Sequence, residues 1–134
     1  MVNIVVATHG ELAEALLQAT EMIAGPVRGL YAVSLLPGES PEAFEQKLEE
    51  LLRKISEEDT LILTDMVGGT PYNVAVRQAR RTTVACVAGV NLPMILELVV
   101  SCDYGEIPIA DLAAYSVQAG RDGIRALGPL LKAP

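Results

Sequence analysis

Aromatic residues are scarce in this sequence, which has one phenylalanine, four tyrosines and no tryptophan among 134 residues. Hydrophobic residues still make up 51% of the chain, so the core must be built from aliphatic side chains and alanine. Such a surplus is typical of a sheet covered by helices on both faces, and it also favours an oligomer interface. The length suits one domain, and we expect a single domain over residues 1–134.

Positive charge is also in short supply. Lysine and arginine total 10 against 17 acidic residues, for a net charge of −7, which argues against nucleic-acid binding because that needs a basic surface. The longest uncharged stretch, residues 82–96, is too short to span a bilayer. The N-terminus lacks the basic region of a signal peptide, so we expect a cytoplasmic protein.

Several common catalytic and cofactor motifs are missing. The chain has a single histidine, and Cys86 and Cys102 form no CxxC pair, so we expect reduced structural thiols and no metal. There is no GxSxG motif of an esterase, no Walker A motif and no GxGxxG motif. We therefore expect no cofactor.

Apolar runs alternate with helical patterns along the whole chain. The runs predict strands at residues 2–7, 29–35, 60–65 and 82–89. Helices are predicted at residues 11–24, 41–56, 71–81 and 93–102, and another begins at residue 108 and breaks at glycines. Ser40 is expected to cap the second helix and Thr70 the third. This alternation indicates an α/β domain with a doubly wound, mainly parallel sheet.

Two polar side chains follow strands of this predicted sheet. His9 comes just after the first predicted strand, and Asp65 stands at the end of the third. The carboxyl ends of parallel strands share one edge, where α/β sheets bind ligands. A carboxylate that accepts a hydrogen bond from Nδ1–H would fix the imidazole tautomer and leave Nε2 free as a nucleophile. Each residue alone has a plainer interpretation: His9 as a polar loop residue, and Asp65 as a cap or turn residue.

The loops beside these residues suit an anion. "HGEL" and "GGTP" both lead into a helix N-terminus, where backbone N–H groups bind phosphate. Gly10, Gly69 and the Thr70 hydroxyl are therefore candidate phosphate-binding groups, although "GGT" alone is also an ordinary tight turn. With a free imidazole nearby, the chemistry that these groups favour is phosphoryl transfer to and from histidine.

Three segments resemble a known family. These are "THG" (8–10), "DMVGGTPYN" (65–73) and "AGVNLPMILE" (88–97). They are similar to the IIA domain of the mannose/fructose/sorbose class of the phosphoenolpyruvate-dependent sugar phosphotransferase system. The similarity runs from Val2 to about Leu127, and the second and third segments together are highly specific.

The resemblance implies a phosphotransferase with a phosphohistidine intermediate. His9 would accept the phosphoryl group on Nε2 from the phosphocarrier protein HPr and pass it to a IIB component. Asp65 would orient the ring, and the Thr70 hydroxyl would lie near the phosphate. The implied fold is a sheet of order 2-1-3-4, with a C-terminal antiparallel strand at 123–127 that is exchanged within a homodimer. The membrane would be contacted only indirectly, through the transporter components.

Two alternatives stay open at this point. A response-regulator receiver would use an aspartate placed as Asp65 is, but it needs an acidic pair where this chain has Thr8-His9-Gly10. A non-enzymatic dimeric binding or regulatory module of the same fold is the other. The related phosphocarrier subunit of dihydroxyacetone kinase shares the fold, but "GGTPYN" and "GVNLPM" are not expected there.

Overall fold

The computed structural model describes residues 2–101 and 107–128 of the chain. It contains four strands: β1 (Asn3–His9), β2 (Leu30–Leu35), β3 (Thr60–Thr64) and β4 (Val84–Ala88). Five helices are described: α1 (Leu12–Ala24), α2 (Pro41–Lys54), α3 (Thr70–Gln78), α4 (Leu92–Val100) and α5 (Ile109–Asp122). The alternation of strands and helices predicted from the sequence is confirmed.

The four strands form one parallel sheet of order β2-β1-β3-β4, as the family resemblance implied. β1 and β3 are the two central strands, and Ala7 of β1 pairs with Thr64 of β3. All four strands therefore end at one edge of the sheet. This register brings the residue that ends β1 beside the residue that follows β3.

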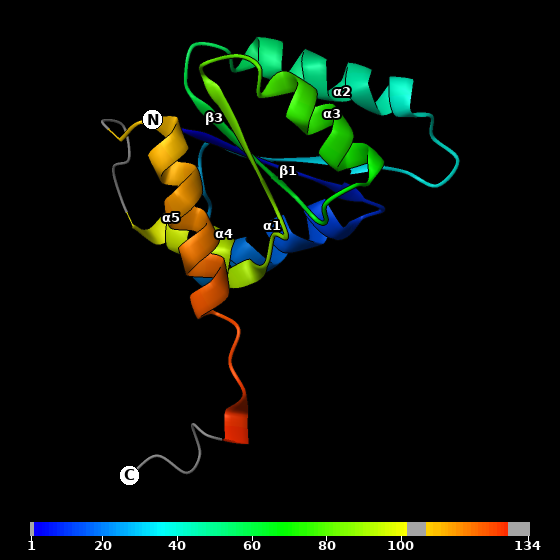
Figure 1. Cartoon of the computed structure of the whole chain (residues 1–134). Coiled ribbons are helices and arrows are strands. Elements are labelled where there is room, and N and C mark those ends of the chain that lie inside the picture. The colour runs from blue at the N-terminus through cyan, green and yellow to red at the C-terminus, as the bar shows by residue number, and fades with distance from the viewer. Residues whose placement is uncertain (1, 102–106, 129–134) are drawn as a thin grey trace.

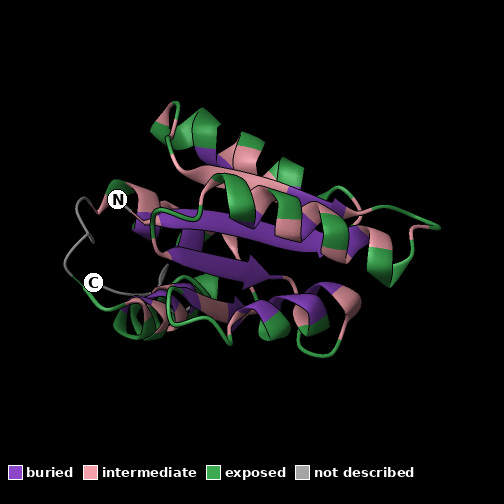
Figure 2. Cartoon of the chain, turned by 90° about the horizontal axis from the view of Figure 1, so that it is seen from above, coloured by how far each residue is buried: buried purple, intermediate pink, exposed green. Residues whose placement is uncertain are grey.

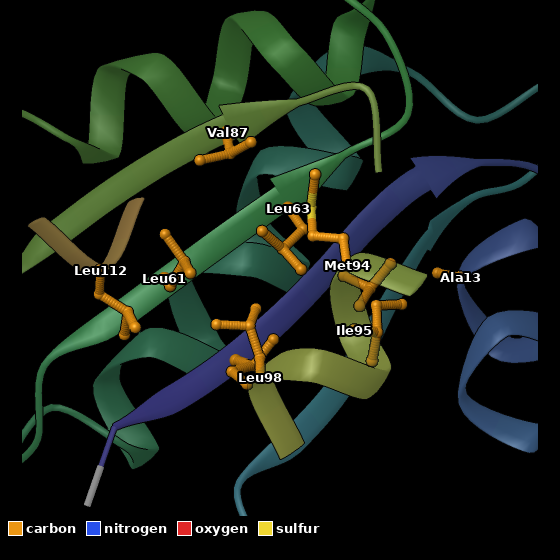
Figure 3. Packing of buried hydrophobic residues seen from close by; sticks show 10 residues of the cluster. Ala13, Leu61, Leu63, Val87, Met94, Ile95, Leu98 and Leu112 are labelled. Carbon is orange, nitrogen blue, oxygen red and sulfur yellow. The ribbon is translucent and has the colours of Figure 1, made fainter. Parts of the chain in front are cut away.

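Helices cover both faces of the sheet: α2 and α3 lie on one face, and α1, α4 and α5 on the other (Figure 1). The central strands β1 and β3 are buried between these layers, the edge strands β2 and β4 are partly buried, and the outward helix faces are exposed (Figure 2). Because side chains alternate along a strand, Leu61 and Leu63 join one core cluster and Ile62 joins the other. Leu61 and Leu63 pack near Met94 of α4 and Leu112 of α5 (Figure 3). The sheet is thus a rigid base for the loops at its carboxyl edge.

Helix starts follow the sequence in one case and depart from it in another. Ser40 caps α2 as predicted, because its hydroxyl accepts a hydrogen bond from the Ala43 N–H at 3.1 Å. The prediction that Thr70 caps α3 was wrong: Gly69 is the N-cap residue, and Thr70 is the first residue of the helix. Gly69 has the extended backbone of an N-cap, and its carbonyl accepts from the Asn73 N–H at 2.9 Å, so the helix starts one residue earlier.

Between the end of α5 and residue 128, where the described part of the chain ends, the structure contains no strand. α5 ends at Asp122, residues 124–126 form no regular element, and the chain runs away from the sheet and helices (Figure 1). The strand at 123–127 is therefore absent from the single chain, and its exchange with a partner stays a prediction. Cys102, the predicted end of the fourth helix, lies outside the described residues.

Candidate functional site

His9 and Asp65 meet at the carboxyl edge of the sheet. His9 is the last residue of β1, and Asp65 directly follows β3. The Nδ1 atom of His9 lies 2.8 Å from Oδ2 of Asp65, and the His9 backbone N–H donates to the same oxygen at 3.0 Å. The other carboxylate oxygen accepts from the Met66 N–H at 3.1 Å. The carboxylate thus holds both the backbone and the ring of His9.

These contacts keep the Asp65 carboxyl ionised. Partial burial raises the pKa of Asp65, but the hydrogen bonds from the side chain and the backbone of His9 outweigh it, so the pKa lies below its ordinary value. An ionised carboxylate has no proton to donate, so Nδ1 must carry the proton of the bond that joins them. In the neutral ring Nε2 then holds a lone pair. The His9 side chain is 46% exposed, against 14% for Asp65, so the imidazole is open to a reactant.

The predicted phosphate-binding residues lie around this pair. Gly10 follows His9 with a φ of 57°, and its N–H donates to the Leu35 carbonyl at 2.8 Å, so that donor is already used. Gly69 caps α3 directly beside the His9 ring: a β-carbon built on it would lie 3.0 Å from Nε2. Thr70 begins α3 and is half-buried. The structure therefore brings the α3 N-terminus to the free nitrogen of His9.

Thr8 is a site residue that the sequence interpretation missed. Its side chain is fully buried, and its hydroxyl accepts from the Ala13 N–H at 2.8 Å. The same hydroxyl lies 3.2 Å from the His9 carbonyl, to which it donates. Thr8 therefore ties the first turn of α1 to the strand end that carries His9. A threonine shortly before a helix is a common capping signal, which could have drawn attention to it.

Exposed apolar side chains occupy the loops of the same edge. Leu12 starts α1, Leu36 follows β2, and Met66 and Val67 follow Asp65; each is at least 45% exposed. In the described residues, no group of three or more His, Cys, Asp or Glu side chains is placed to hold a metal ion. No helix in that part of the chain is long and apolar enough to cross a membrane.

A family model for the fructose IIA component of the phosphotransferase system matches residues 3–107. The chain belongs to this family. The match includes both His9 and Asp65, and it favours neither a receiver nor the dihydroxyacetone kinase subunit.

Individual relatives agree with this assignment. This IIA chain is 34% identical over 128 residues to the mannose-specific EIIAB component of Escherichia coli strain K12. The alignment covers 94% of this chain and 39% of that relative. It is 37% identical over 102 residues to the fructose-specific EIIA component of Bacillus subtilis strain 168, covering 73% of the chain and 68% of that protein. The chain thus spans about two fifths of the length of the Escherichia coli protein.

Solved structures share the fold. The mannose/sorbose specific IIA subunit from Enterococcus faecalis superposes with a TM-score of 0.84 at 32% identity, covering 92% of each chain. The component EIIA from Streptococcus agalactiae also gives a TM-score of 0.84, at 27% identity, and covers 96% of this chain and 99% of that one.

Proposed function

We propose that this IIA component carries a phosphoryl group on Nε2 of His9. It receives the group from the phosphocarrier protein HPr and passes it to a IIB component of a mannose-class sugar transport system. The observation that carries the proposal is the 2.8 Å contact between Nδ1 of His9 and Asp65. That contact leaves a nucleophilic nitrogen on the only histidine of the chain.

In the transfer step, Nε2 of His9 attacks the phosphorus of a phosphohistidine on HPr. A bond forms between Nε2 and phosphorus while the donor's bond between nitrogen and phosphorus breaks, and the donor imidazole keeps the electron pair. His9 releases no proton, because Nδ1–H stays bound to Asp65. The ring therefore becomes a phosphorylated imidazolium, and the Asp65 carboxylate offsets its positive charge. The same step in reverse, with IIB as acceptor, discharges the protein.

The proposed phosphate environment is the N-terminus of α3. Gly69 and Thr70 contribute backbone N–H groups there, and the Thr70 hydroxyl is a further donor. One helix N-terminus typically stabilises a bound anion by about 0.3–1 kcal/mol. Gly10 contributes a turn rather than a donor, because its N–H is bound to Leu35.

The proposed contact surface for HPr and IIB is the carboxyl edge of the sheet. Both partners must bring their reactive groups to His9, so each must cover the exposed apolar side chains that surround it. These are Leu12, Leu36, Met66 and Val67. The proposed unit is one IIA domain over residues 1–134, which meets the membrane only through its transport partners.

Phosphoryl transfer from HPr tests this function directly. Incubation with enzyme I, HPr and labelled phosphoenolpyruvate should give a phosphoprotein that is labile in acid and stable in base, as a phosphohistidine is. HPr in the same mixture serves as the positive control. If HPr is labelled and this chain is not, the alternative function, a non-enzymatic binding or regulatory module, is favoured instead.

We further predict a homodimer in solution. Within the described residues β4 is an edge strand, and Ile124 and Leu127 beyond α5 are 74% and 70% exposed. If residues 123–127 were exchanged between two chains, they would cover both of these side chains and form a strand that pairs with the unpaired edge of β4. Sedimentation equilibrium at micromolar concentration should give twice the 14.2 kDa chain mass. The double variant Ile124→Asp with Leu127→Asp should shift the mass toward the monomer, whereas a monomeric wild-type protein would contradict the prediction.

A further inference from the structure

Gly69 lies against the ring of His9. An ideal β-carbon built on Gly69 would lie 2.5 Å from Cε1 of His9, 3.0 Å from Nε2 and 3.7 Å from Nδ1. The edge of the ring formed by Cε1 and Nε2 therefore occupies the space where any other residue would place its side chain. Carbon atoms in contact normally stay about 3.5 Å apart, so the β-carbon and the ring would overlap by about 1 Å.

The backbone does not explain the glycine at this position. Gly69 has φ −90° and ψ 172°, an extended conformation that every amino acid adopts. The neighbouring Gly68 is the opposite case, because its φ is +91° while a β-carbon built on it would meet nothing within 4 Å. Gly68 therefore serves the turn of the loop, and Gly69 serves the ring of His9.

The geometry points to Gly69 as a positioning residue. Because it has no side chain, its backbone forms a close-fitting surface, here called the seat, that keeps the His9 imidazole in the orientation needed for transfer. Asp65 holds the ring at Nδ1, and Gly69 bounds it along the adjoining edge from Cε1 to Nε2, so together they restrict rotation of the side chain. Nε2 is thereby kept at the N-terminus of α3. The effect of Gly69 on transfer rests on the proposed phosphocarrier function, whereas its effect on the orientation of the ring does not.

Substitution of Gly69 by alanine would test the effect of this seat. In Gly69→Ala the new methyl group must push the ring away, because the contact of Nδ1 with Asp65 fixes the ring where the methyl group would overlap it. The contact from Nδ1 to Oδ2 then lengthens, or the methyl group stands in front of Nε2. A displacement of about 1 Å at a reacting group can cost on the order of 10²-fold in rate, and we expect a loss of that size in transfer from HPr.

A matched control separates the ring from the loop. Gly68→Asn alters the adjacent glycine in the same loop, and asparagine tolerates a positive φ. A β-carbon at Gly68 would meet nothing within 4 Å, so it would not touch the ring of His9. We expect this variant to transfer at the wild-type rate. A loss in Gly68→Asn as large as in Gly69→Ala would mean that the loop as a whole matters, and it would overturn the specific role of Gly69.

Nitrogen-15 NMR of the unphosphorylated full chain gives a measurement that does not require transfer. His9 is the only histidine, so one pair of ring nitrogens appears. The wild type should show Nδ1 protonated and Nε2 unprotonated, with a nuclear Overhauser contact from the ring Hε1 to the Gly69 α-protons. Gly69→Ala should lose the single tautomer, while its thermal unfolding temperature stays close to that of the wild type.

The outcomes distinguish this inference from the proposed function. If the nitrogen-15 signals of the ring are unchanged in Gly69→Ala, Gly69 does not position the ring, whatever the transfer rate. If the signals change but the transfer rate stays that of the wild type, the proposed effect of ring position on transfer is wrong. If neither the wild type nor the variant accepts phosphate, the phosphocarrier function fails, and the transfer role of Gly69 fails with it. Should Gly69→Ala not fold, the wild-type Overhauser contact still decides, because its absence would show that the ring does not lie on Gly69.

Discussion

Replacing His9 with alanine is expected to abolish phosphorylation of this protein by HPr. The chain has one histidine, so no second imidazole can take the phosphoryl group. The side chain is 46% exposed and belongs to neither core cluster, so its loss leaves the packing of the sheet intact. Incorporation of label should fall to the background of the mixture without this protein, and thermal unfolding should change little.

His9→Gln is the matched variant for this experiment. Glutamine keeps a polar side chain with a hydrogen-bond donor in the same place, but it has no nucleophilic nitrogen. It should therefore be as inactive as His9→Ala, which separates the chemistry of the ring from the space that it fills. Label that is undiminished in either variant would place the phosphoryl group on another residue and remove His9 from the mechanism.

Local patterns in the sequence predicted the elements of this fold well. The four apolar runs are β1 to β4. The central strands β1 and β3 are buried on both faces, and such a strand needs an unbroken run of apolar residues. The start of α2 was also predictable, since Ser40 and the proline after it act within a few residues of each other. The strand order, in contrast, came from the family resemblance, because order depends on contacts between distant segments.

Details of the site depend on such distant contacts. Gly69 was taken as part of a phosphate loop and Thr70 as a cap, because hydroxyl side chains favour caps. The structure has Gly69 as the cap of α3 in place of Thr70. It also places the ring of His9 against Gly69, although the two residues are 60 positions apart. Thr8 is a different case: its hydroxyl contacts Ala13 only five positions later, and the local capping signal of a threonine before a helix was overlooked. The exchange of a strand at 123–127 stays a prediction, because it involves contacts with a second chain.

Asp65→Asn is expected to slow transfer in both directions without unfolding the protein. Outer carboxylates that orient a metal-binding histidine are typically worth about 10–100-fold, and we expect a loss in that range. A comparable substitution in a serine-protease triad costs about 10⁴-fold, which sets the upper limit. Phosphoryl transfer depends mainly on positioning and charge, so the smaller value is expected.

The contacts of Asp65 explain why the loss is partial. Oδ2 accepts from both the backbone and the ring of His9, and the other oxygen accepts from the Met66 N–H. An asparagine with its amide nitrogen toward His9 would donate to Nδ1 and place the proton on Nε2, the wrong tautomer for attack. The flipped amide keeps the right tautomer, but it points its nitrogen at the Met66 N–H and lacks the negative charge that offsets the imidazolium. Both orientations are impaired, and neither removes the nucleophile.

Rapid-quench measurements of label moving from phosphorylated HPr to this protein, and back, provide the test. Asp59→Asn removes the same charge just before β3, at the opposite edge of the sheet from His9, and it should transfer at the wild-type rate. The loss in Asp65→Asn should appear in the rate constants for both directions, because the oriented ring is needed whether His9 gains or loses the phosphoryl group. Wild-type rates in both directions would mean that the carboxylate does not control the tautomer, and that Asp65 is a turn residue that happens to contact the imidazole.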